Sequence, residues 1–128
     1  MAARRRASPG AGRESELLKC GQALAKKMNL RKGLVITRGR LGMMVFEPGK
    51  KPVALPIVGS DEVADVTGAG DTVSGVVALG LAAGLGLMES AQLANYAASV
   101  VVMKRGTATV SQSELLRAIQ QDKAASRP

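Results

Sequence analysis

The sequence predicts an α/β fold, and three observations support that prediction. Residues 14–28 carry apolar side chains at helical spacing, the run 34–37 is short and β-branched, and the stretch 70–104 is apolar with few breaks. A helical period indicates a helix that packs on one face, whereas a short β-branched run is typical of a strand buried on both faces. We therefore expect 34–37 to be a central strand of a mostly parallel sheet.

The other elements follow in order along the chain. We expect a turn at 38–42, strands at 43–46 and 53–57, and helices at 70–83, at 88–104 and from Ser111 onward. The segment Pro48-Gly49-Lys50-Lys51-Pro52 indicates a β-hairpin connection between the second and third strands. The first helix ends near Asn29 in this interpretation. No internal repeat interrupts the pattern.

Length and composition limit the functions that are possible. A chain of 128 residues can bury one core. The single cysteine, Cys20, excludes an internal disulfide and favours the cytoplasm, and the uncharged run 72–88 is shorter than the roughly 20 residues that cross a membrane. Histidine is absent, so a general base acting near neutral pH is expected to be a carboxylate.

Positive charge is concentrated near the N-terminus. The formal net charge is +8, and residues 1–13 contain four arginines and no acid. We expect 1–13 and 121–128 to be disordered tails around a folded part at 14–120. Nucleic-acid binding usually needs aromatic platforms, and Phe46 and Tyr96 are the only aromatic residues. We therefore expect no nucleic-acid partner, although a basic tail that binds nucleic acid is an alternative.

The segment Thr67-Gly68-Ala69-Gly70-Asp71 is the strongest chemical signal. Small residues that open directly into a helix let backbone amides converge on an anion at the positive helix end. Asp71 would then lie where a phosphoryl group arrives and could accept a hydroxyl proton. The segment matches neither a Walker loop nor a Gly-x-Gly-x-x-Gly fingerprint. Spacing alone also fits a tight turn with Asp71 as a helix-capping residue.

The longer stretch Asp65-Val66-Thr67-Gly68-Ala69-Gly70-Asp71-Thr72-Val73-Ser74-Gly75 resembles the C-terminal signature of the PfkB or ribokinase family of carbohydrate kinases. The segment 35–42 resembles that family's Thr-x-Gly-x-x-Gly nucleotide loop, and 95–110 resembles its last adenine-side helix and loop. Within the family, 47–50, 65–72 and 104–111 are similar to the heptose 7-phosphate kinase domain of ADP-heptose synthesis. The resemblance implies the C-terminal part of a ribokinase-like three-layer α/β/α fold.

The resemblance also implies roles for single residues. Asp71 would be the catalytic base, and the amides of Gly68, Ala69 and Gly70 the anion hole. Thr37, Gly39, Gly42 and Asn95 would bind the nucleotide, while Asp65, Thr67 and Gly106 would lie near a monovalent cation such as K⁺. The cofactors would be ATP and Mg²⁺, and the reaction phosphoryl transfer to a sugar phosphate, with heptose 7-phosphate the best candidate. No magnesium ligand is assigned.

The chain departs from the family in length. Family members are more than twice as long, and the half that supplies sugar contacts and an Asn-x-x-Glu motif has no counterpart here. The strand at 34–37 and the helix at 70–83 would then lack neighbours and expose apolar surface. We expect the missing half of the domain, or a second copy of the chain, as a partner. A non-catalytic fragment that binds nucleotides is the alternative function.

Overall fold

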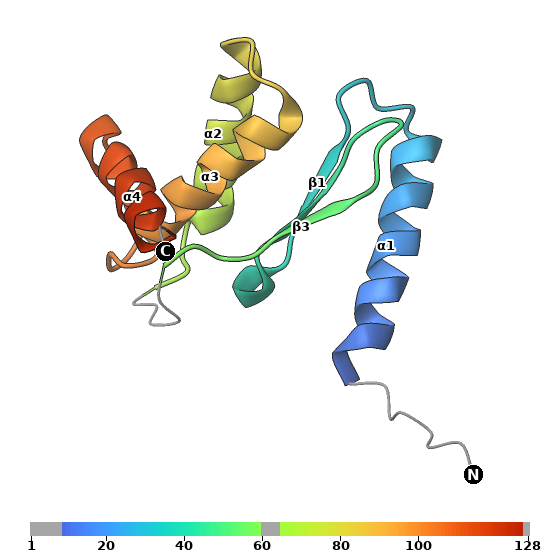
Figure 1. Cartoon of the computed structure of the whole chain (residues 1–128), viewed down its shortest axis with the longest axis horizontal. Helices are drawn as coiled ribbons and strands as arrows, with labels where there is room; N and C mark the ends of the chain where they lie inside the picture. The colour runs from blue at the N-terminus through green and yellow to red at the C-terminus, as the bar shows by residue number, and fades with distance from the viewer. Residues whose placement is uncertain (1–8, 60–64, 127–128) are drawn as a thin grey trace.

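The computed structural model describes residues 9–59 and 65–126, which form four α-helices and a three-stranded sheet (Figure 1). The elements are α1 (Pro9–Lys27), β1 (Leu34–Thr37), the 3₁₀ turn η1 (Gly39–Leu41), β2 (Met43–Phe46), β3 (Val53–Leu55), α2 (Ala69–Ala82), α3 (Leu87–Val101) and α4 (Gln112–Ala125). The chain is therefore α/β, as the sequence predicts.

The sheet is antiparallel, so the prediction of a parallel sheet is wrong for the described residues. Its order is β1-β2-β3, with Leu34 opposite Phe46 and Met43 opposite Leu55. A parallel connection needs a crossover of a dozen residues or more, and the short turn between β1 and β2 permits only an antiparallel pair. All four residues of β2 are buried, whereas β1 is half-buried and lies at the sheet edge.

The helices lie in layers on the two sides of the sheet. In Figure 1, α1 lies on one side of the strands, and α2 and α3 lie on the other. Phe46 faces α1, where its ring lies against Gly21 and leaves no space for a side chain there. Met43 and Val45 face the other way and form a core cluster with Val73 of α2 and with residues of α3.

The third strand ends earlier than predicted. β3 stops at Leu55 rather than at residue 57 because Pro56 has no amide hydrogen to donate to the sheet. The hairpin between β2 and β3 is confirmed, with Gly49 at a φ of 72° in its turn.

Two helices are longer than predicted. α1 begins at Pro9 rather than Glu14, because proline fits the first turn of a helix and Gly10 and Gly12 meet no neighbouring atoms there. α4 continues to Ala125, so the predicted disorder from residue 121 is wrong as far as the helix extends. The disorder predicted for residues 1–8 and for 127–128 lies outside the described residues. α1 ends where Asn29 adopts a φ of 49°, as predicted.

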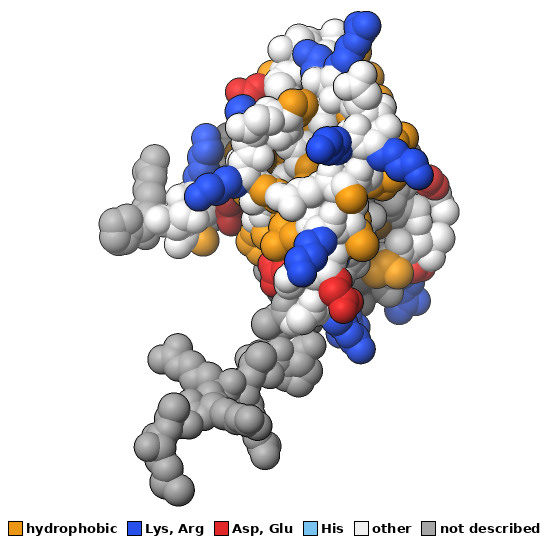
Figure 2. Space-filling model, turned by 90° about the vertical axis from the view of Figure 1, so that its right-hand side faces the viewer, with side chains coloured by type: hydrophobic (Ala, Val, Ile, Leu, Met, Phe, Trp, Pro, Cys, Tyr) orange, Lys and Arg blue, Asp and Glu red, His pale blue; other side chains and the backbone are white. Residues whose placement is uncertain are grey.

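Apolar side chains remain exposed, as the sequence predicts for a partial domain. Leu79 of α2 is 71% exposed and Leu41 is 67% exposed, although both are large and apolar. Within the described residues, the outer edge of β1 pairs with no strand. Figure 2 views the α1 side of the molecule and shows Lys and Arg side chains spread among apolar ones rather than gathered into one basic patch.

Candidate functional site

The residue before helix α2 is a glycine because its backbone conformation requires one. Gly68 is the N-cap residue and has a φ of 79°, a region that residues with side chains rarely adopt. No side chain caps this end of the helix. The amide of Ala69 donates to the Val66 carbonyl at 3.2 Å, so of the three amides predicted to form an anion hole, those of Gly68 and Gly70 are the better donors to a ligand.

Asp71 lies in the first turn of α2, and its side chain is exposed. The helix N-cap is Gly68 rather than Asp71, and Asp71 makes no capping hydrogen bond. The interpretation of Asp71 as a helix cap is therefore not what the structure shows. A carboxylate at this position is stabilised by the positive end of the helix and is accessible to a ligand.

The turn between β1 and β2 forms the facing wall of the site. The amide of Arg38 donates to the Gly42 carbonyl at 2.7 Å, and the amide of Gly42 donates to the Gly39 carbonyl at 3.1 Å. Both glycines have positive φ, 57° at Gly39 and 78° at Gly42. Gly42 also lies directly against the Leu55 carbonyl, where no side chain fits. The two predicted glycines are thus required by the backbone.

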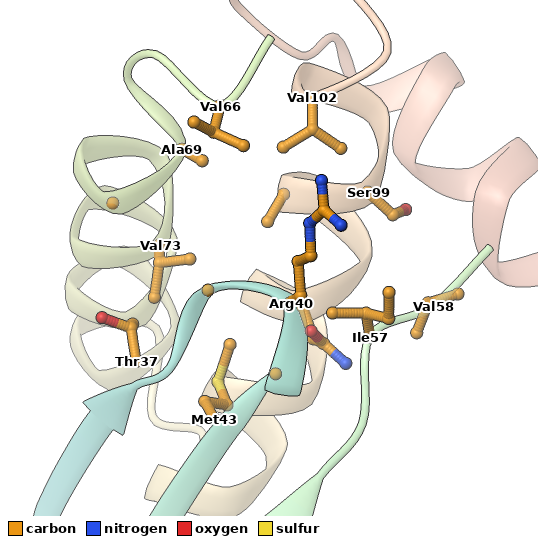
Figure 3. Close-up of a pocket in the computed structure, with 15 residues that line it drawn as sticks. Thr37, Arg40, Met43, Ile57, Val58, Val66, Ala69, Val73, Ser99 and Val102 are labelled. Carbon is orange, nitrogen blue, oxygen red and sulfur yellow. The ribbon is translucent and has the colours of Figure 1, made fainter. Parts of the chain in front are cut away.

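A cavity of about 530 Å³ lies between this turn and helices α2 and α3 (Figure 3). Six of the predicted site residues line it, and they come from segments far apart in the sequence: Thr37, Gly39, Gly42, Ala69, Gly70 and Asn95. Gly68 and Asp71 adjoin Ala69 and Gly70 in the chain without being part of the wall. The structure therefore brings the predicted nucleotide loop and the predicted anion hole to one cavity.

Asn95 is a buried polar residue of the cavity wall. Its side chain is 8% exposed, and its Nδ2 donates to the Pro56 carbonyl at 2.7 Å. This bond fixes the segment after β3 to α3. The side-chain oxygen can accept a hydrogen bond from a ligand amine, and the second hydrogen of Nδ2 remains a donor.

Asp65 connects two loops next to the start of α2. Its carboxylate accepts hydrogen bonds from the Thr67 amide at 2.9 Å, from the Thr67 hydroxyl at 2.6 Å and from the Gly106 amide at 3.0 Å. The bonds from Thr67, and then the one from Gly106, hold the pKa of Asp65 below its usual value. The three residues predicted near a monovalent cation are thus joined through the Asp65 carboxylate, but they do not line the cavity.

Comparison with known proteins agrees with this arrangement. Residues 6–114 match the pattern of the pfkB family carbohydrate kinase. The chain belongs to this family. The "Bifunctional protein HldE" of Yersinia enterocolitica is 52% identical to this pfkB-family chain over 107 residues, which are 84% of the chain and 22% of that protein. The chain thus spans about a fifth of that relative, and the resemblance to the heptose kinase group is confirmed.

Solved structures place the pfkB-family chain in the ribokinase-like fold. Ribokinase of Arabidopsis thaliana, solved in complex with ribose and ATP, is 30% identical and superposes with a TM-score of 0.67 over 77% of this chain and 33% of that one. Phosphofructokinase-2 of Escherichia coli in complex with potassium is 19% identical, with a TM-score of 0.72 over 94% of this chain and 36% of that one. The second likeness concerns the fold alone.

Sequence reasoning missed several cavity residues of this pfkB-family chain. Arg40 lies in the resembling loop without an assigned role, and its side chain rises into the cavity (Figure 3). Val66, Val73 and Val102 form apolar walls, and Ser99 lies beside them. The hydrophobic residues carry no sequence signal that separates a cavity wall from ordinary core. The sequence marks Arg40 only as a charged residue that lies between Gly39 and Gly42.

Within residues 9–59 and 65–126, no group of three or more His, Cys, Asp or Glu side chains is placed to hold a metal ion. We therefore assign no magnesium ligand. No helix in the same part of the chain is both long enough and apolar enough to cross a membrane.

Proposed function

We propose that this chain forms the nucleotide-binding and catalytic portion of a cytoplasmic kinase that transfers the γ-phosphoryl group of ATP to a sugar phosphate, with heptose 7-phosphate as the acceptor. The observation that carries the proposal is the shared cavity. The glycine-bounded turn at 38–42, the start of α2 and the buried Asn95 meet there, although they lie far apart in the sequence.

The reaction needs little covalent chemistry from the protein. Asp71 accepts the proton of the attacking hydroxyl, the hydroxyl oxygen bonds to the γ-phosphorus, and the bond from phosphorus to the bridging oxygen of ADP breaks. The amides of Gly68 and Gly70 face the charge that develops on the transferring group, with the amide of Ala69 weaker because it is shared with Val66. Thr37, Gly39, Gly42 and Asn95 hold the nucleotide in this proposal.

Residues of this chain can be proposed to bind K⁺, whereas none is assigned to Mg²⁺. Mg²⁺ would accompany the phosphates of ATP and neutralise their charge, and no step is assigned to a protein ligand for it. For K⁺ we propose the region of Asp65, Thr67 and Gly106. Asp65 already accepts three hydrogen bonds. One carboxylate lone pair and the Thr67 hydroxyl oxygen are therefore left to coordinate a cation. The residues present therefore fit a weakly held monovalent cation better than a divalent one.

The rest of a kinase domain is the partner that we propose. The chain spans 22% of the HldE protein and 33% of the superposed ribokinase. Leu79 and Leu41 are exposed, and the outer edge of β1 is unpaired within the described residues. Covering this apolar surface and sheet edge would stabilise the chain and complete the acceptor site. Association of two copies is the alternative way to cover it.

The decisive variant is Asp71→Asn, which keeps the shape of the side chain and removes the base. We would measure ADP formation from ATP with heptose 7-phosphate, using the chain alone and a chimera in which residues 6–114 replace their counterpart in the Yersinia relative. Turnover is expected to fall about 100-fold or more, while ATP affinity measured by calorimetry stays unchanged. Glu16→Gln, an exposed carboxylate on α1, is the control and should be neutral.

The alternative function is nucleotide binding without catalysis. It draws on the short span of the chain relative to its relatives and on the lack of an assigned metal site in the described residues. Saturable ATP binding together with no ADP formation in either protein would favour this alternative. Unchanged turnover in Asp71→Asn would instead refute the assignment of the base.

A further inference from the structure

Arg40 stands out among the residues that line the cavity. Among the lining residues that the structure describes, it is the only charged side chain, and the others are apolar, glycine or neutral polar. Figure 3 shows the guanidinium rising from η1 into the space between Val66 and Val102. The ion pairs found among the described residues join Glu47 to Lys50 and Glu114 to Lys104, so neither uses Arg40. Within residues 9–59 and 65–126, the cavity wall therefore carries one positive side chain and no carboxylate.

The backbone of the turn from which Arg40 projects is constrained. Arg38, two residues earlier, points its guanidinium back onto the turn, where Nη2 donates to the Leu41 carbonyl at 2.9 Å. Gly42 is pressed against the Leu55 carbonyl of β3, which supports the turn from behind. The two arginines of one turn thus have different surroundings: Arg38 stabilises the turn, and Arg40 is presented to the cavity by a constrained backbone.

A second positive feature lines the same cavity. Ala69 and Gly70 belong to the first turn of α2, where the helix dipole and the free amide of Gly70 favour an anion, while the Ala69 amide already donates to Val66. Arg40 is exposed, so a ligand can reach its guanidinium, which matches phosphate oxygens in a fork of parallel hydrogen bonds. A ligand with several phosphates can satisfy both features at once, and a neutral nucleoside can satisfy neither.

We propose that Arg40 is a specificity-determining residue that binds phosphate groups of the nucleotide and makes the cavity selective for nucleoside polyphosphates over uncharged nucleosides. This inference rests on the proposed function, since it takes the cavity to be the nucleotide site. It adds a residue to which neither the family resemblance nor the motif spacing gives a role. Arg40 also lies on the wall opposite α2, so the phosphates are held from two sides.

The test compares charged and uncharged ligands on the full chain. Calorimetric titrations with ATP, ADP and adenosine would be carried out on the wild type, on Arg40→Ala, on Arg40→Lys and on Arg31→Ala. Arg31 is an exposed arginine outside the cavity, so its variant controls for the loss of one positive charge. Circular dichroism would check that each variant retains the wild-type helix content.

We expect Arg40→Ala to weaken ATP and ADP binding about 10- to 100-fold, the usual effect of removing a charged hydrogen bond, and to leave adenosine affinity unchanged. Arg40→Lys should recover part of the loss, because it keeps the charge without the fork. Arg31→Ala should bind all three ligands as the wild type does. Higher salt should reduce the difference between ATP and adenosine in the wild type more than in Arg40→Ala.

Other outcomes refute the inference in distinguishable ways. If Arg40→Ala binds ATP as tightly as the wild type, Arg40 has no role and the proposed function still stands. If ATP and adenosine weaken equally, the side chain acts on the base by stacking or on the shape of the turn, and phosphate recognition is refuted. If the folded wild type binds none of the ligands, the proposed function fails and this inference fails with it.

Discussion

Helices α3 and α4 follow one another in the chain, yet they are attached to the molecule by different forces. Seven residues of α3 are buried, and most of them are alanine or another small residue that permits close contact with α2. No residue of α4 is fully buried. Instead, the Tyr96 hydroxyl donates to Asp122 at 2.6 Å, and Lys104 pairs with Glu114 at 2.7 Å.

The difference shows which properties of each helix matter. Close packing makes α3 sensitive to the volume of a side chain, because cavities and clashes in a dense interior both cost free energy. Polar contacts that are part-buried or exposed make α4 sensitive to pH and to single hydrogen bonds, each with a smaller effect. Since α3 supplies Asn95 to the cavity and α4 supplies nothing to it, the site is built on the helix that is harder to disturb.

The largest effect is expected from the same substitution made in both helices. Leu87, at the start of α3, is 5% exposed, whereas Leu116 of α4 is 59% exposed. Leu87→Ala should lower the free energy of unfolding by about 2–5 kcal/mol. Leu116→Ala should change it by about 0.5 kcal/mol or less. Urea unfolding followed by circular dichroism measures both, and similar losses in the two variants would contradict the comparison.

A second pair of variants tests the close approach of α2 and α3. A side chain at Gly80 would meet the Ser90 Oγ at 2.5 Å, so Gly80→Ala should destabilise the chain by about 1–3 kcal/mol. Gly75 lies in the same helix and meets no atom within 4 Å. Gly75→Ala should therefore stabilise the chain by up to about 1 kcal/mol, through helix propensity alone. In thermal unfolding, the melting temperature should fall for Gly80→Ala and rise for Gly75→Ala. A change in the same direction in both variants would refute close packing as the cause.

The hydrogen bond between α3 and α4 can be followed by absorbance. Tyr96 is the only tyrosine and tryptophan is absent, so the increase in ultraviolet absorbance at alkaline pH reports the ionisation of this one phenol. The bond to Asp122 raises the pKa of Tyr96 above its usual value. Stability from this bond is present below about pH 10 and is lost as the pH rises through the raised pKa. Asp122→Asn should lower that pKa, and Tyr96→Phe should cost about 0.5–1.5 kcal/mol.

The smallest effect concerns the start of α4. Lys104, and then Ser111, lower the pKa of Glu114 to about 2 from a usual value of 4.5. The contribution of Glu114 to stability is therefore complete above about pH 4.5 and is lost as the pH falls toward 2. An NMR titration of the carboxyl carbon should show this pKa, and Lys104→Met should raise it. A pKa that stays low in that variant would assign the shift to Ser111 instead.

Much of the fold follows from local sequence. Pro48 to Pro52 predicts the hairpin, and the starts of α2 and α4 lie within one residue of their predicted positions because capping residues and helical periods are local signals. Strand direction is not a local property. The run Leu34–Thr37 looks the same in a parallel and in an antiparallel pair, and only the shortness of the following turn distinguishes them.

Only part of the candidate site could be predicted from the sequence. Residues whose backbone conformation is unusual, such as Gly39, Gly42 and Gly68, are visible in the sequence because glycine tolerates a positive φ. The direction of a long side chain is not visible, so Arg38 and Arg40 look alike until the turn is built. The apolar walls at Val66 and Val102 come from two separate segments, and nothing local in either one marks a cavity.

The bond from Gly106 to Asp65 spans 41 positions, and the two residues flank the hairpin of α2 and α3. The Asp65 amide also donates to the Val102 carbonyl at 3.0 Å, and closing so long a loop with two polar contacts is entropically unfavourable unless the intervening helices have already paired. We therefore expect the hairpin to fold first and the Asp65 contacts to be added afterwards. In that order, the turn that begins α2 takes its final shape late in folding, after the helices that support it have docked.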